Sequence, residues 1–122
     1  MNITGTSGAD SLVGLSGADS IMGLDGADSI MGDAGHDTLD GNEGDDFLWG
    51  GMGNDILWGI DDGDDRLAGG NGEDTFFAMG GYDQLFLHAG DATDGVSDYI
   101  VLWNGDDFHV TVHGFDRSID KL

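Results

Sequence analysis

The sequence has no cysteine, no proline and almost no positive charge. Of its 122 residues, 25 are Asp or Glu and only three are Lys or Arg. The lack of cysteine excludes disulfide bonds and thiolate metal sites. The lack of a basic patch argues against nucleic acid and anionic membrane surfaces as partners. No apolar run approaches the roughly 18 residues of a transmembrane helix, and the N-terminus shows no signal-peptide pattern.

Glycine and acidic residues are abundant instead. The chain contains 24 glycines, and its formal net charge is −22. A chain with this much like charge repels itself and is expected to fold poorly alone. We therefore expect its partners to be cations.

The most informative feature is a repeat of nine residues. Gly41–Trp49 and Gly50–Trp58 align without a gap, with Gly at the first and fourth places, Asp at the sixth, Leu at the eighth and Trp at the ninth. The pattern Gly-x-x-Gly-x-Asp-x-apolar-x continues from Gly5 to Phe86 as nine consecutive copies. The copies begin at Gly5, Gly14, Gly23, Gly32, Gly41, Gly50, Gly59, Gly69 and Ala78. Copy seven is one residue longer, because the pair Asp61–Asp62 fills a single place.

Each fixed place of the repeat has a physical reason. Glycine can adopt the positive φ that sharp turns require. Aspartate supplies hard oxygen ligands, of which a calcium ion takes about six to eight. An apolar residue between two outward-facing neighbours makes a minimal three-residue strand. A six-residue turn followed by such a strand predicts an all-β solenoid, in which two copies make one coil and two parallel sheets enclose a thin core.

These repeats resemble those of the RTX family, the glycine-rich nonapeptide calcium-binding repeats. The resemblance implies a right-handed parallel β-roll of about nine repeats, in which backbone carbonyls of the turns and the sixth-place carboxylates bind calcium between successive coils. The implied metal ligands are Asp10, Asp19, Asp28, Asp37, Asp46, Asp55, Asp65, Asp74 and Asp83. One ion between each copy and the next but one gives about seven Ca²⁺ ions, and their binding is expected to drive folding.

The second place of the repeat departs from the family pattern, which favours glycine there. Only Gly51 and Gly70 comply, and the other copies carry larger residues such as Leu24 and Ile60. An isoleucine at positive φ would be an outlier. Either the second place is not left-handed in this chain or some turns are distorted, and a regular site is least expected at Ile60, beside the insertion.

The repeat stops at residue 86, so we expect residues 1–86 to form the calcium-binding roll and residues 87–122 a capping segment. Asp98–Trp103 and Phe108–His113 have strand-like sequences that flank the turn signal Asn104–Gly105, which predicts a β-hairpin. Its apolar face would cover the last coil, since solenoids need end caps. The end of the chain also resembles the segment after many RTX blocks, which implies a cap or an uncleaved type I secretion signal.

Apolar residues occupy outward-facing places in the middle of the repeat. Phe47 and Trp49 are expected on one outer face, and Ile56 and Trp58, with Phe77, on the other. Such patches usually mark a contact. The candidates are the chain's own C-terminal segment, a second copy of the chain, another protein or a glycan.

Few residues suggest other chemistry. His109 and His113 fall on one face of a strand, but two histidines are an incomplete zinc or nickel site. The sequence contains no Ser/His/Asp set at recognisable spacing, no phosphate loop and no zinc-protease helix. We therefore expect no enzymatic activity from this chain.

The leading hypothesis is a calcium-binding module that is exported unfolded by type I secretion and folds outside the cell. One alternative is a calcium-dependent adhesion or self-assembly protein that forms a homo-oligomer or binds a protein partner through its aromatic faces. Another is the non-catalytic C-terminal module of a larger secreted enzyme. An ice-binding roll would need a regular row of threonines, which the third places do not supply.

Overall fold

The computed structural model describes residues 1–88, 97–102 and 109–114, which form twelve β-strands. The strands are β1 (Asn2–Thr4), β2 (Ser11–Val13), β3 (Ser20–Asp25), β4 (Ser29–Ala34), β5 (Thr38–Glu43), β6 (Phe47–Met52), β7 (Ile56–Gly59), β8 (Arg66–Asn71), β9 (Thr75–Ala78), β10 (Tyr82–His88), β11 (Tyr99–Leu102) and β12 (His109–His113). Within these residues, no helix is long and apolar enough to cross a membrane.

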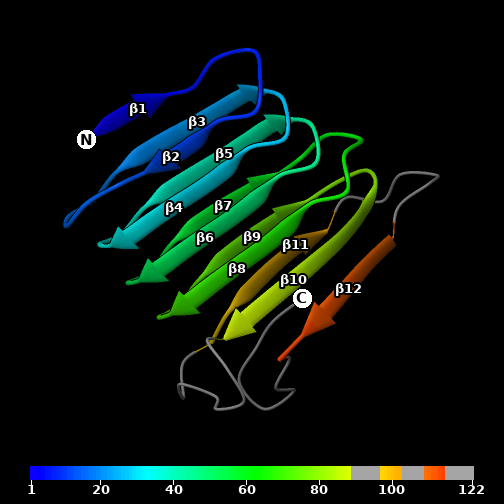
Figure 1. The fold of residues 1–122 in the computed structure, drawn as a ribbon. Coiled ribbons are helices and arrows are strands. Elements are labelled where there is room, and N and C mark those ends of the chain that lie inside the picture. The colour runs from blue at the N-terminus through cyan, green and yellow to red at the C-terminus, as the bar shows by residue number, and fades with distance from the viewer. Residues whose placement is uncertain (89–96, 103–108, 115–122) are drawn as a thin grey trace.

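Successive strands alternate between two six-stranded sheets that lie face to face (Figure 1). One sheet has the order β1-β3-β5-β7-β9-β11 and the other β2-β4-β6-β8-β10-β12. Neighbouring strands in both sheets are parallel, and equivalent places of the repeat are in register, as Leu39 is with Leu57. Two copies therefore make one coil, and the predicted parallel β-roll is confirmed.

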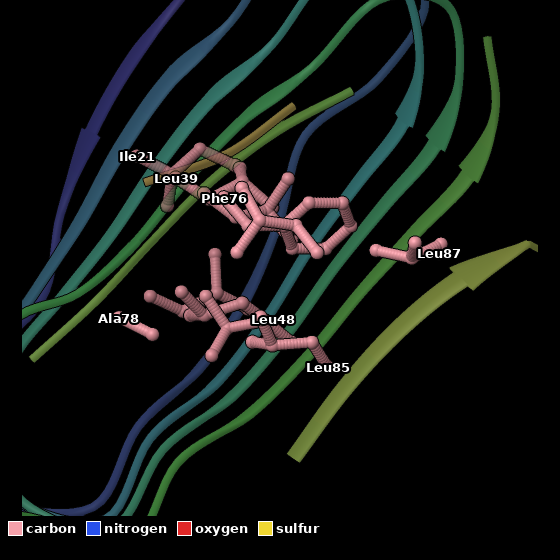
Figure 2. Close-up of a cluster of buried hydrophobic side chains, with 11 residues drawn as sticks. Ile21, Leu39, Leu48, Phe76, Ala78, Leu85 and Leu87 are labelled. Atoms are coloured by element: carbon pink, nitrogen blue, oxygen red, sulfur yellow. The ribbon is translucent and has the colours of Figure 1, made fainter. Parts of the chain in front are cut away.

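The core is a single layer of eighth-place side chains between the two sheets. Ile21, Leu39 and Phe76 project from one sheet toward Leu48 and Leu85 from the other (Figure 2). Each of these five side chains is no more than 1% exposed. This row supplies most of the hydrophobic stabilisation, at about 2 kcal/mol for each buried side chain, and the buried first-place residues Ala78 and Leu87 add to it.

The regular strands are longer than the predicted three residues. β3, β4, β5, β6 and β8 each have six residues, because pairing continues through the first three places of the next copy. The pairing of β3 with β5 includes Asp25 with Glu43, whereas the pairing of β5 with β7 ends at Asp40 with Trp58. Copy seven, which contains the additional residue, begins directly after Trp58. The insertion therefore interrupts the longer pairing between β5 and β7.

The second place differs between copies, and the alternative that it is not left-handed in this chain is wrong for three non-glycine residues. The place is left-handed at Leu24, Asp33 and Asn42, with φ of 85°, 78° and 67°, as it is at Gly51 and Gly70. Ile60 does not adopt positive φ. Leu24 therefore adopts the left-handed conformation, whereas the β-branched Ile60, for which its steric cost is greatest, does not.

The predicted C-terminal hairpin is wrong. β11 pairs in parallel with β9, and β12 pairs in parallel with β10, so the two strands lie in different sheets. Each strand satisfies the free backbone edge of its sheet, and Ile100 aligns with Phe76 to extend the core. A hairpin would leave both edges unpaired. Asn104–Gly105 and Phe108 lie outside the described residues, and Val110 and Val112 pack against the core cluster.

The alternation of buried and exposed residues in β7 allows a test of the strand register. Leu57→Ala should lower the free energy of unfolding of the calcium-loaded protein by about 3 kcal/mol, because it empties a fully buried position. Ile56→Ala, at a neighbouring side chain that is 37% exposed, should lower it by less than about 1 kcal/mol. Urea denaturation in calcium measures both. Equal losses would contradict the register.

Candidate metal centre

The sixth-place aspartates stand at the entrance of each strand and are buried. Eight of the nine are between 0% and 7% exposed. The exception is Asp10 in the first copy, which is half-buried. Buried carboxylates are rare unless a partner compensates them, so the contacts of these side chains decide what the roll can bind.

One oxygen of each sixth-place carboxylate after Asp10 accepts a hydrogen bond from the preceding coil. Asp28 Oδ1 accepts a hydrogen bond from the backbone N–H of Asp10 at 2.8 Å, and Asp46 Oδ1 accepts one from Asp28 at 2.8 Å. Repetition of this contact produces two rows. The Asp28 ladder comprises Asp10, Asp28, Asp46, Asp65 and Asp83. The Asp37 ladder comprises Asp19, Asp37, Asp55, Asp74 and Asp98.

The second carboxylate oxygen is buried without a hydrogen-bond partner at many rungs. This holds for Oδ2 of Asp28, Asp37, Asp46, Asp55, Asp65 and Asp83. A buried carboxylate oxygen without a donor is costly, and a bound cation would remove that cost. The same local geometry repeats along both ladders, so it is a property of the repeat.

The first-place glycine leaves room for two oxygens. A Cβ on Gly32 would lie 2.5 Å from Asp37 Oδ2 and 2.6 Å from the carbonyl oxygen of Gly50, one coil further on. Carboxylate and carbonyl oxygens therefore converge on the point that a side chain would fill. In eight copies the glycine thus leaves this space open, whereas copy nine has Ala78 at its first place.

The donor set fits calcium. The converging atoms are carboxylate and carbonyl oxygens, the ligands that Ca²⁺ prefers. Among the described side chains, no three His, Cys, Asp or Glu residues form a metal site by themselves. A calcium ion on this roll would therefore be held by the sixth-place carboxylates together with backbone carbonyls of the turns.

Burial shifts the acidity of the ladder carboxyls. Burial, with a smaller contribution from neighbouring carboxylates, raises the pKa of Asp46, Asp55 and Asp83 to about 6 and that of Asp65 to about 8. Backbone N–H donors act in the opposite direction. Asp19 is the exception, because the hydrogen bond from the Met1 α-ammonium lowers its pKa. The metal-free ladders thus resist ionisation at their centre.

The structure adds positions that the nonapeptide pattern does not mark. Asp98 is fully buried, and its Oδ1 accepts the backbone N–H of Asp74 at 2.9 Å, so it occupies the sixth place of a tenth copy. At the other end, the Met1 α-ammonium donates to Asp19 Oδ1 at 2.5 Å, and Ile3 pairs with Ile21. Two features of the sequence could have marked these positions. Asp98-x-Ile100 repeats the spacing between the sixth-place Asp and the eighth-place apolar residue. Ile3 stands at the eighth place of a partial copy before Gly5. The Asp28 ladder ends at Asp83, because Val110 pairs with it.

The predicted aromatic faces lie on opposite sheets. Phe47 and Trp49 are on β6, where they are 36% and 40% exposed. Ile56 and Trp58 are on β7 in the other sheet, and the Trp58 ring stacks on Phe77 with centroids 3.8 Å apart. The side chains are therefore grouped as expected.

His109 and His113 do not form a shared metal site. They are four residues apart on β12, which separates their Cα atoms by about 13 Å. Each imidazole instead stacks on an aromatic ring of β10, His109 on Tyr82 and His113 on Phe86.

A parallel roll with two rows of buried carboxylates beside turn carbonyls defines a calcium-binding β-roll. The model of the RTX calcium-binding nonapeptide repeat (4 copies) matches residues 4–39, 32–59 and 61–94. These matches cover well over half of the chain, which therefore belongs to the family of RTX calcium-binding repeats. A search of curated proteins finds no match.

The raised pKa values predict how the metal-free chain responds to pH. A carboxyl with a pKa of about 6 or 8 in the roll and about 4 in the unfolded chain favours the folded state below pH 4, and this contribution is lost as the pH rises through 6 to 8. We expect circular dichroism without calcium to show more β-structure at pH 5 than at pH 8. With limiting calcium the trend should reverse, because protons compete with the metal. More β-structure at pH 8 without calcium would contradict the assignment.

Proposed function

We propose that this chain is a folding switch, which binds several Ca²⁺ ions along the two ladders and folds as it binds them. The observation that carries the proposal is the row of buried carboxylate oxygens without hydrogen-bond partners. We propose the nine sixth-place aspartates as ligands, with about seven ions between successive coils. We add Asp98 as a tenth candidate ligand, because it occupies the equivalent place in the Asp37 ladder.

Repulsion along the ladders is the reason that folding would require the metal. Neighbouring strands of a sheet lie about 4.8 Å apart, so equivalent carboxylates recur at about that spacing. Two such charges repel by about 3 kcal/mol at an effective dielectric constant of about 20. A dication between them replaces repulsion with attraction, so its binding energy becomes folding energy.

The proposed setting is extracellular. A cytosol poor in calcium would keep the chain unfolded and suited to type I export, and millimolar calcium outside the cell would fold it. We propose residues 87–122 as a capping segment that includes an uncleaved secretion signal, and residues 1–86 as the main calcium-binding roll. We propose no catalytic role. Where a larger secreted enzyme carries this segment, the roll would be its C-terminal module.

Circular dichroism tests the switch directly. The chain should show coil in chelator and β-structure in millimolar calcium, and full β-structure in excess chelator at pH 7.5 would overturn the proposal. Asp28→Asn should lower the free energy of unfolding in calcium by about 2 kcal/mol, because it weakens a proposed calcium ligand at a buried rung. Glu73→Gln is the control, since Glu73 is an exposed acid next to the buried rung Asp74, and its effect should be within about 0.5 kcal/mol.

A second candidate function is calcium-dependent self-association. β11 and β12 extend the sheets at their ends, and Phe47, Trp49 and Ile56 remain more than a third exposed. Exposed aromatic patches of this kind favour a protein contact. We propose a second copy of the chain or another protein as the partner of these faces.

Light scattering in calcium checks this candidate. If the faces bind a second copy, Trp49→Ser should weaken dimerisation at least about tenfold, as loss of a central aromatic contact does. Val13→Ser is the control, because Val13 also stands at a ninth place of the same sheet and is 51% exposed. A calcium-loaded protein that remains monomeric at high concentration would contradict self-association.

A further inference from the structure

The charge of the roll is concentrated at its turns and is almost absent from its two outer faces. In the nine copies, the seventh- and ninth-place side chains include one acid, Asp40, and one base, Arg66. Asp40 is on β5, in the sheet whose outer surface we call the β7 face, and Arg66 is on β8, in the sheet whose outer surface we call the β6 face. The two faces can therefore approach each other without the repulsion expected of a net charge of −22.

Asp40 is a carboxylate on the apolar β7 face. It aligns with Trp58 on the neighbouring strand β7 and with Met22 on β3. Its Oδ1 is buried and has no hydrogen-bond partner among the described residues. Burial raises the pKa of this carboxyl, although a hydrogen bond from the Asn42 backbone acts in the opposite direction. A carboxylate in such surroundings is costly unless a cation compensates it, so the β7 face favours a positive partner.

Arg66 is the complementary feature of the β6 face. It is exposed, and it aligns with Phe47 on β6. Its guanidinium lies over the ring of Phe86, 5.5 Å from the centroid. Among the side chains that the structure describes, Arg66 makes no ion pair. A guanidinium that stacks on a ring keeps its donors available for a carboxylate, so each face carries one charge beside its apolar patch, and the two charges are opposite.

The apolar patches also match when the β6 face of one copy is laid on the β7 face of another. The strands of the two sheets run in opposite directions (Figure 1). Rotation of the second copy by half a turn about the normal to the sheets therefore makes the facing strands parallel. Alignment of β6 with β7 then brings Phe47 opposite Ile56 and Trp49 opposite Trp58, because each pair holds the same places of the repeat.

The same alignment brings the two charges together. Because the second copy is inverted, β8, which follows β6 in its sheet, faces β5. Asp40 then lies opposite the small side chain of Ala68 and about 7 Å along the strand from the position opposite Arg66. The guanidinium already leans toward the ninth-place row, since it lies over Phe86. A long arginine side chain can therefore reach Asp40 in the space beside Ala68.

We propose that the β6 face of one copy binds the β7 face of a second, inverted copy, and that Arg66 pairs with Asp40 across this contact. The inference rests on the proposed self-association and names its partner, its two surfaces and its charge pair. Because the surfaces differ, each assembly leaves a β7 face free at one end and a β6 face at the other. The contact therefore continues into an open chain of copies.

Charge reversal in calcium tests the pair. Asp40→Lys and Arg66→Glu should each weaken association at least about tenfold by light scattering, because each variant brings two like charges together. An equimolar mixture of the two variants should associate about as strongly as the wild type, since every contact between unlike copies again joins opposite charges. Glu73→Lys is the control for net charge, because Glu73 is exposed at a turn, and it should not weaken association. Circular dichroism in calcium checks that each variant folds.

The outcomes separate this arrangement from other contacts. A contact between two β7 faces would be insensitive to Arg66→Glu, and a contact between two β6 faces would be insensitive to Asp40→Lys. Either result overturns the proposal while leaving self-association intact, and so does a mixture that fails to associate. If a variant does not fold, the wild-type protein decides, because its mean mass should rise steadily with concentration, and a mass that stops at two copies overturns the open chain.

The proposal and the calcium function fail in different ways. A wild-type protein that folds in calcium but stays monomeric overturns the second copy as the occupant of these faces and leaves them to another protein, while the calcium switch stands. A chain that binds no calcium overturns the switch itself.

Discussion

The hydrogen bond from one aspartate N–H to the next aspartate carboxylate is the contact on which the rest of this structure depends. It recurs in every coil with distances of 2.8–3.0 Å. The contact fixes the spacing of the coils, but it also stacks like charges in a buried row. A cation bound at each rung would relieve the repulsion between these carboxylates, which is the physical basis of the proposed calcium-dependent folding.

The other fixed places of the repeat make room for the aspartate ladders and support them. The first-place glycine clears the space where Asp37 Oδ2 and the Gly50 carbonyl meet. The eighth-place side chain supplies the thin core that holds the two ladders apart. If each cation is shared between two coils, as proposed, binding at one position would favour order at the next, as expected of a quasi-one-dimensional solenoid. Among the described residues, one ladder extends to Asp98 and the other stops at Asp83, which pairs with Val110.

The side chains on the outer faces of the two sheets take no part in the ladders or the core. Seventh- and ninth-place side chains point away from both the core and the ladders, so Trp49 and Trp58 can serve recognition without disturbing the metal positions. The insertion in copy seven is different in kind. The additional residue alters a turn, where the Asp61 carboxylate accepts the hydrogen bond from the Gly44 N–H in place of a backbone carbonyl. Substitutions on the outer faces therefore need not disturb the ladders, whereas an insertion alters the hydrogen bonds of a turn.

The sequence alone determined the parallel roll, its all-β class and nine candidate ligands, because a nine-residue period with fixed Gly, Asp and apolar places admits few other folds. It also predicted the grouping of the aromatic faces, since alternate copies must lie on opposite sheets. The tertiary structure decided what depends on pairing across coils. It moved Tyr99–Leu102 and His109–His113 from a hairpin into separate sheets, because free strand edges outweighed a local turn signal. It placed Asp98 in a ladder, forced Leu24 to positive φ and aligned Asp61 with a turn carbonyl. These outcomes arise from contacts between coils, 17 to 27 residues apart in the sequence, which no local pattern contains.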